Sequence, residues 1–281
     1  MKFLVIIILA IPSILSAQVN VTGFVTNAAL DALPYSNIVL LRKNTGTVTN
    51  EKGLFNLSNL LSDDSIKISN VGFHSRIIAV KDLKNGDSIL LTNSIEQLPG
   101  IHLRNFLNYQ RESELGFFHH SSNGAFQLIP GNQIAIYISN ESNKEGWIKS
   151  VDFKIKDFGK CRNTFRVRIL ANDNQYFSPA ADLLNENVII ESGTLKKTNH
   201  IDLSNYRIIM PPEGIFIVLE WIDAGNECEK NSFVSIAATL TVPDNIVWLN
   251  FRDRAWSKNH RPRLPNGNYM TPNIGLTVAY R

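Results

Sequence analysis

The sequence predicts an all-β protein built from two sandwich domains. Short runs rich in β-branched and aromatic residues recur along the chain, and Gly, Asn, Asp or Pro separates them. The runs tend to alternate apolar and polar residues, and helical periodicity is absent. The length of 281 residues suits one large or two ordinary domains, and a hydrophobic content of 44% supplies ample material for buried cores.

Residues 1–17 have the layout of a secretory signal peptide. Lys2 precedes an apolar run over residues 3–15, and small residues lead to an expected cleavage point after Ala17. A membrane-spanning helix is the alternative, but it needs roughly 20 apolar residues, and this run is shorter and contains Pro12. We therefore expect an exported mature chain without a membrane span, located in the periplasm, at the cell surface or in the medium.

The charge of the chain argues against nucleic acid as a partner. The formal net charge is +3, and loss of Lys2 with the signal peptide lowers it to +2. A protein so near neutrality has no strong electrostatic attraction for nucleic acid or for an anionic membrane surface.

Residues 18–103 are predicted to form the first sandwich, with seven strands. One stretch within it, GTVTNEKGLFNL, is predicted to be a hairpin in which Gly53 occupies a turn position with positive φ. Phe55 and Leu57 then fall on one face of the returning strand and should enter the core. The other strand-like runs are VNVTGFV, SNIVLL, DSIKISNVG, SRIIAV and DSILL.

These residues resemble the carboxypeptidase-regulatory-like module, a β-sandwich similar to transthyretin that is common in exported proteins of Bacteroidetes-type bacteria. The resemblance spans Val19 to Leu103 and rests on VTGFV, LPYSNI, GTVTNEKGLFNL and IKISNVGF, where the third stretch matches the family's GTxTDxxGxFxL. Asn50 replaces the usual Asp and Phe73 the commoner Tyr, which keeps a turn former and an aromatic ring. The resemblance implies a fold and almost nothing about function.

Residues 104–130 mix charges, glycine and aromatics, and they are predicted to be a connector that partly packs. Residues 131–281 are predicted to form a larger, jelly-roll-like sandwich, with a weaker resemblance to galactose-binding-like domains. Within TFRVRIL, apolar residues alternate with Arg166 and Arg168, which predicts one apolar and one cationic face. The nearly continuous apolar runs GIFIVLEWI and FVSIAATLTV are typical of central strands covered on both faces.

The chain has two cysteines, Cys161 and Cys228, both in the second half. In an oxidising compartment such a pair can close a disulfide. The alternative is two separate buried thiols. Their spacing matches no metal-site pattern.

A search for catalytic motifs identifies no catalytic residues, no metal site and no cofactor. None of the histidines, including the adjacent pair His119 and His120, stands at a zinc-ligand spacing from a carboxylate, and GxSxG is absent. Glu220 is the one carboxylate in a strongly apolar run. There it could act as a general acid, and the alternatives are a position at a strand end or a pairing with an arginine. The loops at residues 62–65 and 172–174 could hold calcium, but they are more typical of ordinary polar turns.

The densest unusual patch is NFRDRAWSKNHRPRLPNG. Its aromatic ring could stack on a sugar while the guanidinium groups bind hydroxyls or an anionic group. The alternative is a solvated loop with the indole tucked into the edge of the sandwich. The predicted ligand-binding residues are Arg252, Arg254, Trp256, Arg261 and Arg263.

Three functional hypotheses follow from these patterns. The first is a non-enzymatic exported envelope protein, in which one sandwich is a spacer and the other binds a glycan or a protein. The second is an accessory carbohydrate-active or peptidase enzyme whose carboxylates converge only in the fold. The third is a purely structural component of an envelope assembly.

Overall fold

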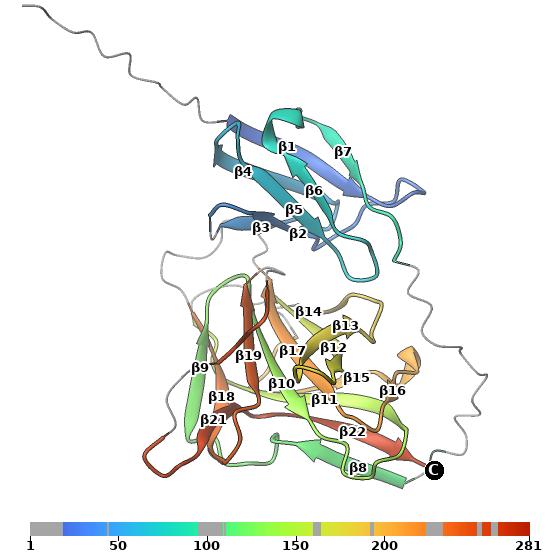
Figure 1. Ribbon diagram of the computed structural model, residues 1–281, viewed down its shortest axis with the longest axis vertical. Coiled ribbons are helices and arrows are strands. Elements are labelled where there is room, and N and C mark those ends of the chain that lie inside the picture. The colour runs from blue at the N-terminus through green and yellow to red at the C-terminus, as the bar shows by residue number, and fades with distance from the viewer. Residues whose placement is uncertain are drawn as a thin grey trace, which may run out of the picture.

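The computed structural model describes residues 19–43, 45–94, 109, 111–159, 164–191, 194–222, 233–251, 255–259 and 264–281. They form two β-sandwiches, one stacked on the other (Figure 1). The prediction of an all-β fold is confirmed. The predicted signal peptide at residues 1–17 lies outside the described residues.

The first sandwich has a three-stranded sheet in the order β4-β1-β7 and a four-stranded sheet in the order β3-β2-β5-β6. Strand β1 pairs antiparallel with β4 and parallel with β7. The core between the sheets includes Val25, Ile38, Phe55 and Leu57. The elements are β1 (Val19–Thr26), β2 (Asn37–Leu40), β3 (Gly46–Val48), β4 (Leu54–Leu60), β5 (Ser65–Ser69), β6 (Arg76–Ala79), the short 3-10 helix η1 (Val80–Asp82) and β7 (Asp87–Leu90).

The hairpin prediction for GTVTNEKGLFNL is wrong, although its core residues are correct. Strand β3 pairs with β2 and β4 pairs with β1, so the stretch is a corner between the two sheets. Gly53, at φ +71°, donates to Asn50 and gives its carbonyl to the N–H of Val25 on β1. The side chain of Asn50 accepts two backbone N–H bonds, from Lys52 and Leu54. The turn thus directs the chain onto β1, because the glycine packs against that strand.

The second sandwich packs a seven-stranded sheet, β13-β12-β17-β10-β19-β20 with β14 beside β12, against an eight-stranded sheet, β21-β18-β11-β22-β8 with β9, β15 and β16 at its sides. Every pairing in these two sheets is antiparallel. The strands are β8 (Arg111–Gly116), β9 (Gly124–Leu128), β10 (Asn132–Ile138), β11 (Gly146–Asp157), β12 (Thr164–Asp173), β13 (Ser178–Asp182), β14 (Val188–Ile190), β15 (Thr198–Asp202), β16 (Ile209–Met210), β17 (Ile215–Ile222), β18 (Val234–Val242), β19 (Val247–Phe251), β20 (Ser257–Lys258), β21 (Tyr269–Pro272) and β22 (Ile274–Tyr280), with a 3-10 helix η3 (Ser204–Tyr206).

The stretch predicted to be a connector, residues 104–130, contains two strands of the second sandwich. Strand β8 pairs with β22, and β9 pairs with β18. Both partners lie more than a hundred residues further along the chain, so the local mixture of charges and glycine does not reveal the pairing.

Strand β12 has the two faces that its alternation predicts. Phe165, Val167 and Ile169 are fully buried between the sheets, whereas Arg166 and Arg168 project from the outer face. The run GIFIVLEWI becomes β17, which lies between β12 and β10 and is buried along its whole length. In the part of the chain that the structure describes, no helix is long and apolar enough to cross a membrane.

Candidate functional site

The first sandwich docks on the outer face of the seven-stranded sheet through polar contacts. Glu220 on β17 lies in register with Arg166 on β12, and the Arg166 Nη1 donates to Glu220 Oε2 at 2.8 Å. Asn37, on β2 of the first sandwich, donates from Nδ2 to Glu220 Oε1 at 2.8 Å. Arg166 Nη2 in turn donates to the carbonyl oxygen of Tyr35. Both oxygens of the Glu220 carboxylate therefore have partners, one from each sandwich.

This ion pair is buried, since the side chains of Arg166 and Glu220 are each 1% exposed. Taking two charges out of water is costly unless the geometry and the additional hydrogen bonds compensate. Asn37 and the Tyr35 carbonyl supply those hydrogen bonds. Of the roles that the sequence left open for Glu220, the structure shows the pairing with an arginine.

Two further contacts close the junction. Asn187 donates from Nδ2 to Asn70 Oδ1 at 2.8 Å. The backbone of Gly72, at φ +82°, lies against the backbone of Asn185 in the second sandwich. A Cβ atom at position 72 would lie 2.7 Å from the carbonyl oxygen of Asn185. A side chain at position 72 would therefore push the sandwiches apart.

The phenol of Tyr35 also belongs to this junction. Burial raises the pKa of the Tyr35 phenol above its ordinary value, and the carboxylates of Glu51 and Glu191 raise it further. The phenol of Tyr35 therefore interacts electrostatically with one carboxylate from each sandwich, Glu51 and Glu191.

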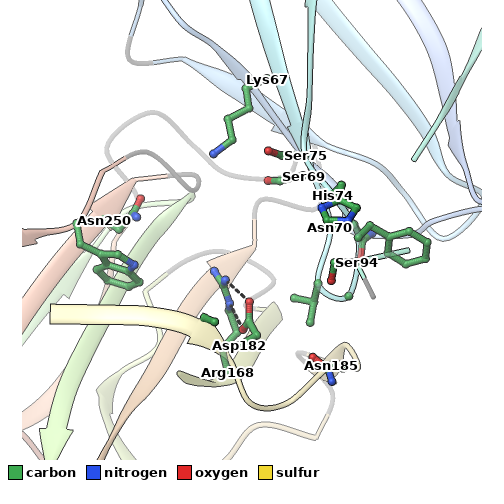
Figure 2. Close-up of a pocket in the computed structure, with 15 residues that line it drawn as sticks. Lys67, Ser69, Asn70, His74, Ser75, Ser94, Arg168, Asp182, Asn185 and Asn250 are labelled. Carbon is green, nitrogen blue, oxygen red and sulfur yellow. Dashed lines mark hydrogen bonds and ion pairs between the residues drawn. The ribbon is translucent and has the colours of Figure 1, made fainter. Parts of the chain in front are cut away.

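Beside these contacts lies a cavity of about 330 Å³ that both sandwiches line (Figure 2). Its walls are mainly polar. Amide side chains come from Asn70, Asn185 and Asn250, and hydroxyl groups from Ser69, Ser75 and Ser94. The charged or titratable lining residues are Lys67, His74, Arg168 and Asp182, and Trp256 supplies an indole ring.

The alternation of β5 explains how the first sandwich contributes to this cavity. Ile66 and Ile68 are fully buried in the core of that sandwich. Neighbouring residues on a strand point to opposite faces, so Lys67 and Ser69 face outward, where both line the cavity. Figure 2 shows the Lys67 side chain reaching from β5 into the space between the sandwiches.

Arg168 and Asp182 form the floor on the side of the second sandwich. Arg168 donates from Nε to Asp182 Oδ1 at 3.0 Å and from Nη2 to Asp182 Oδ2 at 2.8 Å. A third donation, from Nη1, reaches Gln133 Oε1 at 3.3 Å. The two hydrogen bonds to Asp182 form a bidentate pair that engages both carboxylate oxygens and fixes the plane of the guanidinium group.

Of the residues predicted to bind a ligand, Trp256 is the one that the structure describes. It directly precedes the edge strand β20, lines the cavity and packs against an apolar cluster on the outer face of the sheet. That cluster consists of Ala135, Leu170, Phe216 and Val218. The indole is thus both tucked against the sandwich edge and part of the cavity wall.

The other predicted residues, Arg252, Arg254, Arg261 and Arg263, lie outside the described residues, as do Cys161 and Cys228 with their proposed disulfide. Sequence reasoning missed most of the cavity. The Asn and Ser residues that line it stand in loops and strands of ordinary composition, and their sequence spacing carries no recognisable signal.

A second cavity, of about 310 Å³, is lined by residues of β8, β11 and β22 in the eight-stranded sheet. His119 and His120 both line it. The two residues follow β8 in a turn, which lets neighbouring side chains reach one cavity. His119 Nε2 lies 2.9 Å from Glu114 Oε2, and His200 Nδ1 lies 2.8 Å from Asp152 Oδ1. Within the described residues, no group of three or more His, Cys, Asp or Glu side chains could hold a metal ion.

The two acidic loops considered for calcium have local hydrogen bonds. Arg42 pairs with Asp63 at 2.9 Å, and Asp64 Oδ2 accepts the N–H of Leu61. In the second loop, Asp173 Oδ1 accepts the N–H of Gln175. These contacts are those of polar turns.

Solved structures share only low similarity with this chain. Among solved structures, the cysteine protease and lectin-like domains of a surface layer associated protein of Clostridium difficile align with a TM-score of 0.41 and 11% identity, covering 84% of this chain and 45% of that one. A DUF3823 family protein from Parabacteroides merdae aligns with a TM-score of 0.21 and 10% identity, over 74% of this chain and 100% of that one. The present chain thus spans about half of the clostridial chain or less. No curated protein matches.

The family comparison identifies the first sandwich. The model of the CarboxypepD_reg-like domain matches residues 21–100. This range agrees with the resemblance found in the sequence from Val19 to Leu103, and it covers strands β1 to β7. Residues 21–100, which form the first sandwich, therefore resemble a CarboxypepD_reg-like domain, and the match covers less than half of the chain.

Proposed function

We propose that this chain is an exported, non-enzymatic binding protein of the cell envelope, and that it holds a glycan in the cavity between its sandwiches. The observation that carries the proposal is the composition of that cavity. An indole ring, Trp256, stands in one wall among amide and hydroxyl groups from both domains. Aromatic faces stack on the apolar faces of sugars, and amides and hydroxyls exchange hydrogen bonds with sugar hydroxyls.

In this proposal the CarboxypepD_reg-like domain is more than a spacer. It supplies Lys67, Asn70 and His74 to the cavity wall, and the buried contacts around Glu220 hold it in place. A site assembled in advance loses little freedom when it binds, which favours affinity.

A glycan array tests the proposal, with the mature chain compared with Trp256→Ala, Trp256→Phe and Trp147→Ala. We expect wild type to bind a glycan and Trp256→Ala to lose at least about tenfold in affinity, because truncating an aromatic anchor of a binding site costs about 2 kcal/mol or more. Trp256→Phe should retain most of the affinity. Trp147, on β11 of the eight-stranded sheet, is a matched control that should bind normally. Absence of any glycan ligand, or unchanged binding by Trp256→Ala, would reject the proposal and favour a protein partner or a structural role.

The second cavity favours a second candidate function, that of an accessory carbohydrate-active enzyme. Glycoside hydrolysis needs two carboxyl groups flanking a cleft, and Glu114 and Asp152 both line this cavity. Turnover of oligosaccharides by the mature chain, lost in Asp152→Asn, would establish this function. Lack of turnover across a panel of glycans would exclude it.

A further inference from the structure

We infer that the glycan of the proposed site is an extended chain, and that sugar units beyond the cavity stack on Trp248 and on the paired rings of Tyr137 and Phe177; this inference rests on the proposed function. The starting observation is a series of aromatic rings on the outer face of the seven-stranded sheet. The apolar cluster that Trp256 contacts beside the cavity also packs against Tyr137 and Trp248. The cavity wall thus continues into an aromatic track, which consists of Trp256, Trp248, Tyr137 and Phe177.

The strand register places the rings of the track one after another along the sheet. Trp248 on β19 lies opposite Ala135 of β10, and Tyr137 lies two residues further along β10. In the other direction, the antiparallel pairing of β19 with β20 leads from Trp248 toward Asn250 and Trp256, which both line the cavity. Because a strand advances about 3.4 Å per residue, these two steps of two residues span roughly 13 Å. The track is therefore longer than a single ring and suits a ligand with several units.

The end of the track away from the cavity is open to solvent. Phe177, in the turn between β12 and β13, is 57% exposed, and its ring meets that of Tyr137 edge to face at a centroid distance of 6.1 Å. The Tyr137 ring packs in turn on the buried ring of Phe216, at 5.5 Å. An exposed ring that neighbouring rings hold in place can stack on a sugar with little loss of freedom.

The backbone at Phe177 has an unfavourable conformation. Its φ is +49°, in the left-handed region, which is an outlier for a residue with a bulky side chain. The turn maintains this conformation, because the Phe177 N–H donates to the Asp173 carbonyl oxygen at 2.7 Å and Asp173 Oδ1 accepts the N–H of Gln175 at 2.9 Å. Such conformations concentrate at sites that contact ligands. A stacking role accounts for a large ring kept exposed in a strained turn.

Polar groups lie beside the rings of the track. Lys258 Nζ lies 6.0 Å from the centroid of the Trp248 ring, and the Tyr137 hydroxyl donates to the carbonyl oxygen of Glu213 at 2.8 Å. Rings separated by polar groups suit a ligand whose apolar faces and hydroxyl groups recur along a chain, which is the chemistry of a polysaccharide.

Oligosaccharides of increasing length test the inference. Gluco-, xylo-, manno- and chito-oligosaccharides, from disaccharide to hexasaccharide, are measured by calorimetry with the full mature chain, Trp248→Ala and Phe177→Ala, and circular dichroism checks that each variant is folded. We expect at least one hexasaccharide to bind wild type about tenfold or more tightly than its disaccharide, since it contacts further aromatic anchors. Trp248→Ala and Phe177→Ala should each remove most of this gain.

Phe24→Ala is the matched control for loss of a surface ring. Phe24 is 39% exposed on β1, in the other sandwich and outside the cavity lining, so its removal should leave the gain with chain length intact. Equal affinity for short and long probes that is lost in Trp256→Ala would overturn the extended-chain inference and leave the proposed glycan site standing. A gain with length that both track variants keep would have the same meaning. Binding of none of the probes would overturn both.

Discussion

Replacing Asn37 with alanine tests whether the two sandwiches depend on each other for stability. Asn37 is 1% exposed and donates to Oε1 of Glu220, a carboxylate that is itself 1% exposed and belongs to the other sandwich. Without this donor, one oxygen of a buried charge loses a partner. Hydrogen bonds to charged groups contribute about 1.5–3 kcal/mol, so we expect the second sandwich to lose about 2 kcal/mol of stability.

The distribution of tryptophan makes the assay specific. All four tryptophans, Trp147, Trp221, Trp248 and Trp256, lie in the second sandwich, whereas Asn37 lies in the first. Unfolding of the full mature chain in urea, followed by tryptophan fluorescence, therefore reports mainly the second sandwich, with Trp256 at the junction responding also to separation of the two sandwiches. A substitution in the first sandwich can shift this transition only through the junction.

Asn56→Ala provides the matched control. Asn56 lies on β4 of the first sandwich with its side chain exposed, so the substitution makes the same change in strand propensity without touching the junction. We expect it to shift the fluorescence transition by less than about 0.5 kcal/mol, as is usual for surface positions. If Asn37→Ala and Asn56→Ala behave alike, the contact between Asn37 and Glu220 does not couple the domains, and the reasoning is refuted.

Three further substitutions test the core, the ion pair and the tyrosine. Phe55→Ala should destabilise the first sandwich by about 3–5 kcal/mol because it empties a core site, whereas Phe24→Ala, at a 39% exposed position, should cost far less in calorimetry. Glu220→Gln should destabilise the protein by about 3–5 kcal/mol by leaving Arg166 buried without its anion, and a loss below 1 kcal/mol in urea unfolding would contradict this role. The raised pKa of Tyr35 means that the folded state holds its proton more tightly than the unfolded state, so this stabilisation is complete below about pH 10 and is lost as the pH rises through the folded pKa. Tyr35→Phe should therefore flatten the fall in stability above about pH 10, and an unchanged pH profile would argue against it.

The family match and the first sandwich were accessible from the sequence because they depend on local patterns. The turn chemistry of Asn50 and Gly53 and the two-residue alternation that buries Phe55 are both written within a few consecutive residues. The pairing partners were not accessible in this way. Strands β3 and β4 follow each other in the chain yet belong to different sheets. The turn between them is bonded to β1, where the N–H of Val25, more than twenty residues away, donates to the carbonyl oxygen of Gly53.

The candidate site shows the same division. The sequence alone indicates that Arg166 and Arg168 share a face, that Glu220 lies in a buried strand, and that Trp256 is the aromatic residue of an unusual patch. The fold was needed to show that Asn37, 183 residues from Glu220, completes its hydrogen bonds, and that Lys67 and Trp256 line one cavity shared by the two sandwiches. Alternation along a strand specifies which face a side chain occupies, whereas the partner on that face depends on how the two sandwiches dock.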